Sequence, residues 1–224
     1  MENKQAELAR LFALAPVIAV VVIEDANQAV PLARALLEGG VQGIEITLRT
    51  PAALDAIRAI AQELPQAAVG SGTVLTPEDF AASEKAGARF AVSPGCTPRL
   101  LAAAADSALP YLPAAATASE VMGLLEEGYR HQKFFPAAAA GGVAALRSIA
   151  GPLPAVRFCA TGGITAETAG AYLALPNVPC VGGSWLTPAS SVAANDWPAI
   201  ARLARQACGL RTRLISASAN ADAG

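Results

Sequence analysis

The chain has 224 residues, of which 54% are hydrophobic, 15% are charged and only 5% are aromatic, and its net charge at pH 7 is -2. This length suits one domain of the larger kind, with a core built mainly from alanine, valine, leucine and isoleucine. The nearly neutral charge balance and the lack of a basic cluster argue against nucleic acid and anionic membranes as partners.

Cysteine and histidine usage argues against disulfides and zinc. The chain has one histidine, His131, and four cysteines without C-x-x-C spacing: Cys96, Cys159, Cys180 and Cys208. Neither a disulfide framework nor a zinc site is expected from this set, and such cysteines are typical of a reducing compartment. The polar first ten residues do not resemble a secretory signal, and the apolar run 11–23 is too short to span a bilayer. We therefore expect a cytoplasmic protein.

Short β-like runs alternate with amphipathic, alanine-rich stretches along the chain. After a first helix at 4–14, strands are predicted at 17–23, 43–48, 67–73, 90–93, 110–112, 132–135, 156–160 and 179–182. Helices are predicted between and after them at 27–38, 51–63, 77–86, 98–105, 118–126, 142–150, 166–173 and 197–206. Eight alternations with short connections predict an α/β fold with a parallel sheet, and eight strands close a (β/α)8 TIM barrel. An open doubly wound sheet is the alternative, but its G-x-G-x-x-G fingerprint after the first strand is missing.

Local signals set the expected boundaries. Three Thr-Pro pairs place a threonine N-cap before a proline at the first helical position: Thr50 with Pro51, Thr76 with Pro77, and Thr97 with Pro98. From Arg211 onward the apolar periodicity is lost. We therefore expect one barrel domain over residues 1–210 and a largely disordered C-terminal tail over residues 211–224.

Polar residues cluster where the predicted strands end, and barrel active sites lie at those ends. Glu45, Thr47 and Arg49 close the second strand, Thr73 ends the third, and Ser93, Pro94 and Gly95 end the fourth. A carboxylate between two isoleucines is costly unless it is paired. Two interpretations are open: a structural ion pair with Arg49, or a proton-shuttling Glu45 beside an Arg49 that grips a substrate carboxylate.

Lys133 lies in the apolar run HQKFFP, and the chain has only two other lysines, Lys4 and Lys85. Burial disfavours the charged form of an amine, and a neutral lysine is the nucleophile that forms Schiff bases with carbonyl substrates. A snorkelling lysine at a strand end is the alternative. The catalytic interpretation is favoured because the carboxylate, the arginine and a candidate phosphate site are predicted at the same barrel mouth.

That phosphate site is predicted from two glycine pairs. Thr161, Gly162 and Gly163 follow the seventh strand and precede a helix predicted from Ala166, while Gly182, Gly183 and Ser184 end the eighth strand. Glycines let backbone N–H groups approach an oxyanion, and the loops after strands seven and eight commonly bind phosphate in this barrel. The combination indicates carbon–carbon bond chemistry on a phosphorylated keto acid.

These residues lie in segments that resemble the 2-keto-3-deoxy-6-phosphogluconate (KDPG) aldolases, class I aldolases of the Entner–Doudoroff pathway. The matching segments are GGVQGIEITLRT, VGSGTVL, AGARFAVSPG, HQKFFPA, RFCATGGIT and VGGSWL, and the similarity runs from about residue 15 to residue 209. The resemblance implies a homotrimer that needs no metal or other cofactor, cleaves KDPG to pyruvate and glyceraldehyde 3-phosphate, and also acts on 4-hydroxy-2-oxoglutarate.

The resemblance also implies a role for each site residue. Lys133 would form the Schiff base, and Glu45 would be the general acid and base, acting partly through water. The implied substrate-binding residues are Arg49 and Thr73 for the pyruvate carboxylate, Pro94 and Phe135 around the imine, and Thr161, Gly162, Gly163, Gly183 and Ser184 for the distal phosphate.

Two positions depart from the family pattern, and three other functions stay open. Ala138 stands where the family usually has glutamate, and Ala114 where a glycine commonly follows the fifth-strand proline. Both are expected near the mouth, so aldehyde preference and rate are open, as is a role for His131.

The alternatives are an aldolase for the galactonate epimer, which Thr161 disfavours by resemblance, a metal-free phosphosugar isomerase or thiamine-phosphate-type synthase, and a non-catalytic phosphosugar-binding protein.

Overall fold

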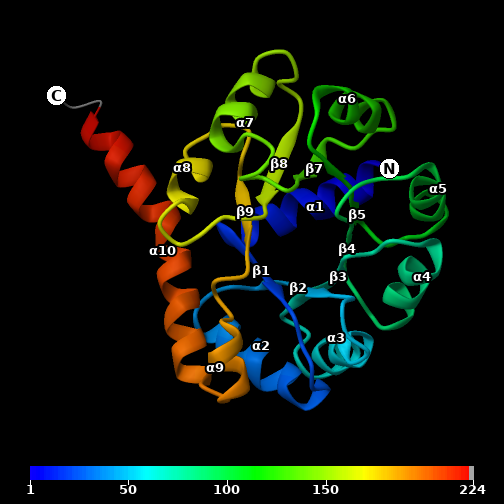
Figure 1. Cartoon of the computed structure of the whole chain (residues 1–224), viewed down its shortest axis with the longest axis vertical. Helices are drawn as coiled ribbons and strands as arrows, with labels where there is room; N and C mark the ends of the chain where they lie inside the picture. Colours follow the sequence, from blue (N-terminus) through cyan, green and yellow to red (C-terminus); the bar gives the residue numbers. More distant parts are fainter. Residues whose placement is uncertain (222–224) are drawn as a thin grey trace.

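The chain folds into a ring of parallel strands surrounded by helices (Figure 1). The computed structural model describes the backbone of residues 1–221 and the side chains of residues 1–210. The strands are β1 (Val17–Val21), β2 (Gly43–Thr47), β3 (Ala68–Gly72), β4 (Ala91–Val92), β5 (Tyr111–Leu112), β6 (Ala114–Ala115), β7 (His131–Phe134), β8 (Arg157–Thr161) and β9 (Cys180–Gly183). The helices are α1 (Glu2–Leu14), the 3-10 turn η1 (Ala26–Gln28), α2 (Ala29–Glu38), α3 (Ala53–Glu63), α4 (Pro77–Lys85), α5 (Pro98–Asp106), α6 (Ala118–Glu126), α7 (Gly142–Ala150), α8 (Ala169–Leu173), α9 (Ala189–Ala193) and α10 (Trp197–Ala221).

The predicted (β/α)8 barrel is confirmed, with its fifth strand split in two. The strand order is β5-β4-β3-β2-β1-β9-β8-β7-β6. β5 pairs with β4 and β6 pairs with β7, and only Pro113 separates β5 from β6. Proline has no N–H to give to a ladder, which interrupts the strand. The Pro113 carbonyl still accepts a hydrogen bond of 2.8 Å from the Lys133 N–H, so β5 and β6 together close the ring.

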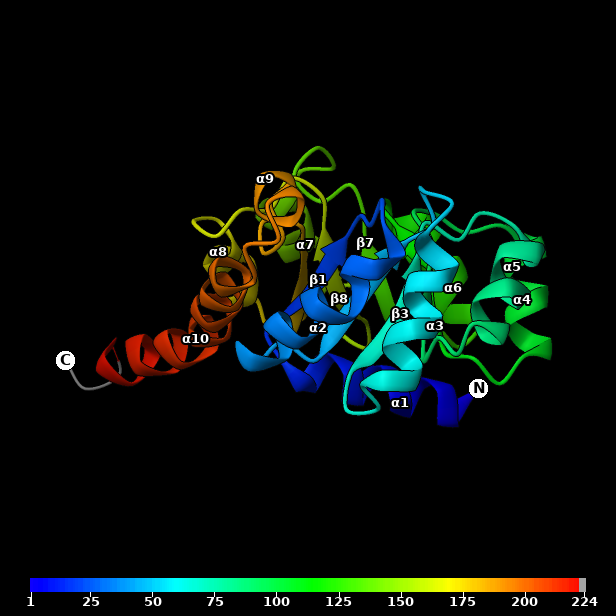
Figure 2. The ribbon, with the colours of Figure 1, turned by 90° about the horizontal axis from the view of Figure 1, so that it is seen from below.

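Apolar side chains fill two regions on either side of the strands. The larger core lies between the strands and the surrounding helices, and includes Ile44, Ile57 and Phe158. A smaller cluster lies inside the barrel, where Leu8, Leu11 and Phe12 of α1 pack against strand residues. Figure 2 shows α1 lying across one end of the strands. The extra N-terminal helix therefore plugs the amino-terminal end of the barrel and leaves the carboxyl ends as the mouth.

Helix starts agree with the sequence at two Thr-Pro pairs and differ at the third. The Thr76 and Thr97 hydroxyls accept hydrogen bonds from the N–H groups of Asp79 and Leu100, as N-caps do. The Thr50 hydroxyl instead donates to the Ile23 carbonyl, and α3 begins at Ala53 without a side-chain cap. Thr50 therefore ties two loops of the mouth together rather than starting a helix.

The last helix reaches into the expected C-terminal tail. α10 runs from Trp197 to Ala221, and its second half extends beyond the barrel (Figures 1 and 2). The helix therefore includes residues 211–221, where arginine, leucine and alanine favour helix even without an apolar stripe. Residues 222–224 of the expected tail lie outside the described residues. None of the described helices combines the length and apolarity needed to cross a bilayer.

Candidate active site

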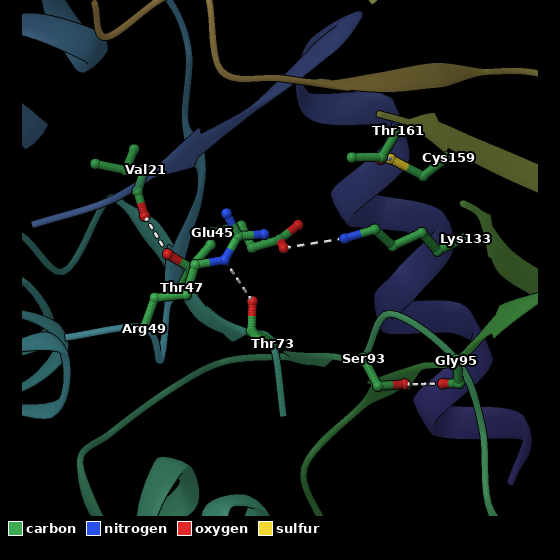
Figure 3. Close-up of polar contacts among 10 residues, drawn as sticks. All are labelled: Val21, Glu45, Thr47, Arg49, Thr73, Ser93, Gly95, Lys133, Cys159 and Thr161. Carbon is green, nitrogen blue, oxygen red and sulfur yellow. Dashed lines mark hydrogen bonds and ion pairs between the residues drawn. The ribbon is translucent and has the colours of Figure 1, made fainter. Parts of the chain in front are cut away.

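Lys133 and Glu45 meet inside the barrel. Lys133 Nζ lies 3.1 Å from Glu45 Oε1, and the two side chains are only 6% and 4% exposed. They come from β7 and β2, which are separated by three other strands, and they point toward each other across the barrel (Figure 3). Desolvating two charges costs several kcal/mol each, so such a pair is weak evidence for a purely stabilising role.

Gly72 makes room for the carboxylate. Thr47 of β2 is in register with Gly72 of β3, and Glu45 leans over this glycine. A β-carbon built on Gly72 would lie 2.6 Å from Glu45 Cγ and 2.8 Å from Cδ, closer than real carbon atoms pack. Gly72 was not among the predicted site residues. The alternating glycines of VGSGT, with Gly70 and Gly72 on the same face of the strand, were the signal that could have found it.

The sequence-based ion pair between Glu45 and Arg49 is not formed among the described residues. The Arg49 N–H donates to the Thr47 carbonyl at 2.8 Å, so the chain turns directly after β2 and the strand alternation stops. Arg49 is exposed at the mouth, and its Nε donates to Thr73 Oγ1 at 3.4 Å (Figure 3). A guanidinium left exposed at the mouth can take an anionic ligand.

Thr73 has an unusual backbone. It directly follows β3 with φ of 60°, in the left-handed region that β-branched residues rarely adopt. Such strain costs about 1 to 3 kcal/mol and often occurs at functional sites. Its hydroxyl accepts from Arg49, so the two residues predicted to bind the carboxylate lie together.

Phe135 lies close to the lysine, and Pro94 lies in the loop after β4. The ring of Phe135 lies 5.3 Å from Lys133 Nζ, within the range of a cation–π contact. Pro94 is half-buried in the loop after β4. The neighbouring Ser93 hydroxyl donates to the Gly95 carbonyl and fixes a tight turn in this loop (Figure 3).

The two glycine loops come together at the ends of β8 and β9. Thr161 is in register with Gly182, which places Gly162 and Gly163 beside Gly183 and Ser184. Gly162 and Gly163 have φ of 103° and 73°, a conformation that favours glycine over other residues. The helix after this loop starts at Ala169, not at Ala166, and has only five residues. A turn in which the Thr165 N–H donates to the Thr168 hydroxyl precedes the helix.

The remaining sequence expectations fall in different places. The Ala138 N–H donates to the Gly162 carbonyl at 3.0 Å, so this departure from the family pattern borders the glycine loop. Ala114 is buried in β6, in register with Lys133. His131 starts β7 at the opposite end of the barrel, where its Nδ1 lies 3.1 Å from Gln5 Oε1 of α1. It is therefore far along the strand from the mouth.

Other titratable residues lie outside the Lys133–Glu45 pair. No group of three or more histidine, cysteine, aspartate or glutamate side chains within residues 1–210 could hold a metal ion. Burial, and then the charges of Arg157 and Arg130, lower the pKa of His131 below its usual value. His131 therefore titrates away from the Lys133–Glu45 pair, at the amino-terminal end of the barrel.

A barrel that holds a buried amine against a carboxylate, with an exposed arginine and two glycine loops at the same mouth, resembles the enzymes that act on carbonyl compounds through a Schiff base. The sequence model of the KDPG and KHG aldolase family matches residues 9–203. The chain therefore belongs to this family and is an aldolase, a kind of lyase.

Individual relatives agree with this membership. The chain is 49% identical over 207 residues to the KHG/KDPG aldolase of Escherichia coli K12, covering 92% of this chain and 97% of the relative. The KDPG aldolase of Legionella pneumophila, solved with pyruvate captured as a covalent carbinolamine intermediate, superposes with a TM-score of 0.87 at 47% identity, over 88% of this chain and 96% of that one. The Zymomonas mobilis ZM4 enzyme, solved with 3-phosphoglycerate, also gives a TM-score of 0.87, at 44% identity over 92% and 97% of the two chains.

Proposed function

We propose that this enzyme cleaves 2-keto-3-deoxy-6-phosphogluconate to pyruvate and glyceraldehyde 3-phosphate through a Schiff base on Lys133. The observation that carries the proposal is the buried 3.1 Å contact between Lys133 Nζ and Glu45 Oε1. It supplies a nucleophile and a proton-transfer group within reach of one carbonyl carbon. Membership of the aldolase family and the relatives' names support the choice of substrate.

Imine formation uses the pair directly. Transfer of one proton from the Lys133 ammonium to Glu45 leaves a neutral amine beside a neutral acid. The amine nitrogen attacks the C2 ketone carbon, giving a carbinolamine. Glu45 then protonates its hydroxyl, which leaves as water, and the product is a protonated imine that withdraws electrons from C3.

Bond cleavage follows from that electron sink. The Glu45 carboxylate removes the C4 hydroxyl proton, directly or through water. The C3–C4 bonding electrons move into the imine to form an enamine, and glyceraldehyde 3-phosphate leaves. Glu45 returns the proton to C3, and water hydrolyses the protonated imine, which releases pyruvate and restores the Lys133 ammonium. Each proton that Glu45 takes is returned within the cycle.

The other mouth residues hold the two ends of the substrate. Arg49 and Thr73, already in contact, would bind the carboxylate, with Pro94 and Phe135 around the imine. The backbones of Gly162, Gly163 and Gly183, with the hydroxyls of Thr161 and Ser184, would hold the phosphate. Binding energy at the phosphate positions the reacting bond over the amine.

The gluconate epimer is favoured over the galactonate epimer by similarity. The superposed structure named KDPGal is only 26% identical to this chain, against 47% for the Legionella pneumophila KDPG aldolase. An isomerase or a phosphosugar-binding protein would have no use for the buried lysine–glutamate contact. We propose 4-hydroxy-2-oxoglutarate as a further substrate, because a relative with a TM-score of 0.82 carries both activities in its name.

We also propose a cytoplasmic homotrimer, as the family resemblance implies. The four cysteines all lie within the described residues and form no disulfide, which fits a reducing compartment. Light scattering coupled to size-exclusion chromatography gives the subunit number directly, and a monomer or dimer contradicts the trimer.

A coupled assay tests the activity. Pyruvate release from KDPG is followed through lactate dehydrogenase and NADH absorbance for the native enzyme and for the Lys133→Arg and Lys85→Arg variants. Lys85 is exposed on α4 and serves as the matched control. We expect native turnover for Lys85→Arg and none above background for folded Lys133→Arg. Cleavage by folded Lys133→Arg at a rate near that of the native enzyme contradicts the mechanism.

A further inference from the structure

Tyr111 belongs to the split fifth strand but reaches the loop that carries Pro94. Its side chain is 1% exposed and lies in the outer core, between the strands and the helices. The next residue, Leu112, faces the barrel interior instead, as strand alternation requires. Tyr111 therefore approaches the mouth from outside the barrel and cannot touch a substrate held within it.

The Tyr111 hydroxyl is the centre of a small polar cluster. It lies 2.6 Å from the Ser93 hydroxyl, to which it donates, and 3.9 Å from Cys96 Sγ. Ser93 in turn donates to the Gly95 carbonyl, which also accepts from the Ala114 N–H at 3.4 Å. These contacts fix residues on both sides of Pro94.

The same strand touches the reactive lysine. Ala114 is in register with Lys133, and Pro113, two residues after Tyr111, accepts the Lys133 N–H. The cluster therefore connects the Pro94 loop with the strand beside Lys133. A shift of the loop relative to this strand changes the distance between Pro94 and the amine.

The tyrosine itself is held rigidly. Its ring makes edge-to-face contacts with Phe80, at a centroid distance of 5.6 Å, and with Tyr129, at 5.9 Å. Burial, and then the nearby Cys96, raise the pKa of Tyr111 above its ordinary value, so the phenol stays protonated as a donor. A clamped ring with one hydroxyl against two loop side chains is suited to fixing position.

We propose that Tyr111 is a positioning residue for the pyruvyl end of the site: its hydroxyl, through Ser93 and Cys96, holds Pro94 against the imine formed on Lys133. The inference rests on the proposed function and adds a residue that touches neither substrate nor the reacting atoms. It predicts that loss of the hydroxyl weakens pyruvate capture without altering the phosphate end.

The test compares Tyr111→Phe with Tyr129→Phe. Tyr129 is a buried neighbour whose hydroxyl makes no side-chain hydrogen bond among the described residues, so this variant controls for loss of a buried phenol. Pyruvate with borohydride measures capture at Lys133, and inhibition of KDPG cleavage by inorganic phosphate measures the other end. For Tyr111→Phe we expect the half-saturating pyruvate concentration to rise about fivefold, equal to about 1 kcal/mol, with an unchanged phosphate inhibition constant. Tyr129→Phe should match the native enzyme in both.

Ser93→Ala removes the other partner of the same hydrogen bond. If Tyr111 acts through Ser93, the double variant is no worse than the worse single variant, because coupled effects are not additive. Native pyruvate capture by folded Tyr111→Phe overturns the proposal, as does an equal loss at both ends. Native enzyme that forms no pyruvate adduct at all instead refutes the proposed function, so the two failures are distinguishable. If Tyr111→Phe does not fold, Ser93→Ala alone carries the comparison.

Discussion

The Gly72→Ala substitution should move the Glu45 carboxylate while leaving the glutamate itself unchanged. The added methyl group would lie 2.6 Å from Glu45 Cγ, whereas carbon atoms pack at about 3.5 Å or more. The Glu45 side chain must therefore retreat by about 1 Å, which lengthens its 3.1 Å contact with Lys133. Gly72 does not have a left-handed φ, so the substitution adds no backbone strain. The conflict is with the side chain of Glu45.

The cost to turnover and to stability follows from that displacement. A misplacement of about 1 Å can reduce the rate about a hundredfold, and proton transfer by a side chain contributes at least as much. We therefore expect kcat for KDPG cleavage to fall about a hundredfold. Overpacking should lower the free energy of unfolding by about 1 to 3 kcal/mol, which leaves the protein folded at room temperature.

Steady-state cleavage and thermal unfolding measure the two effects. Glu45→Gln gives the reference loss for a carboxylate of the same size, and Gly72→Ala should approach it. Gly123→Ala is the control, because a β-carbon at Gly123 meets nothing within 4 Å. A folded Gly72→Ala enzyme with kcat within about twofold of native would falsify the view that Gly72 sets the catalytic position of Glu45.

Three further predictions concern the mouth and the opposite end of the barrel. Arg49→Ala should raise KM for KDPG at least about tenfold, because a charged hydrogen bond to the carboxylate is worth about 1.5 to 3 kcal/mol. The inhibition constant of inorganic phosphate should change less. An unchanged KM contradicts the assignment of Arg49 to the carboxylate. Thr73→Gly should relieve the left-handed strain and, after the entropy cost of glycine, raise the free energy of unfolding by about 1 kcal/mol. It should also weaken pyruvate capture, because the hydroxyl is lost. A lower free energy of unfolding in urea titrations argues against strain at this residue. Burial lowers the pKa of His131 in the folded protein. Below about pH 6.5 the unfolded chain therefore binds more protons than the folded protein. The free energy of unfolding should fall as pH drops from about 6.5 toward the lowered pKa of the folded state. His131→Asn should lessen that fall, measured as urea midpoints at about pH 7 and 5, and an unchanged pH slope refutes the idea.

The barrel itself could be predicted because its local signals agree with one another. The apolar runs and alanine-rich helices alternate eight times, and the threonine caps at Thr76 and Thr97 mark real helix starts. The short helix α9 was missed because its five residues, Ala189–Ala193, are too few for a helical period to be visible. The extension of α10 to Ala221 was not predicted because helix propensity does not require an apolar stripe.

The convergence of the candidate residues at one mouth could be predicted once a barrel was expected, whereas the individual contacts among them could not. Lys133 and Glu45 are 88 residues apart in sequence, and only closure of the barrel shows that they meet. Arg49 was the nearer candidate partner by spacing, but the turn after Thr47 removes it from the face of Glu45. Gly72 and Tyr111 escaped notice because their roles depend on what lies opposite them in space, which residue type alone does not show.

The central claim is that Lys133 forms a covalent imine with the keto acid. The most direct measurement is mass spectrometry of the native enzyme after incubation with pyruvate and borohydride, with peptide mapping of the product. We expect one reduced pyruvyl group per chain, located on Lys133 and lost in Lys133→Arg. An unmodified Lys133 in folded enzyme, or an adduct that maps to Lys4 or Lys85, would contradict it.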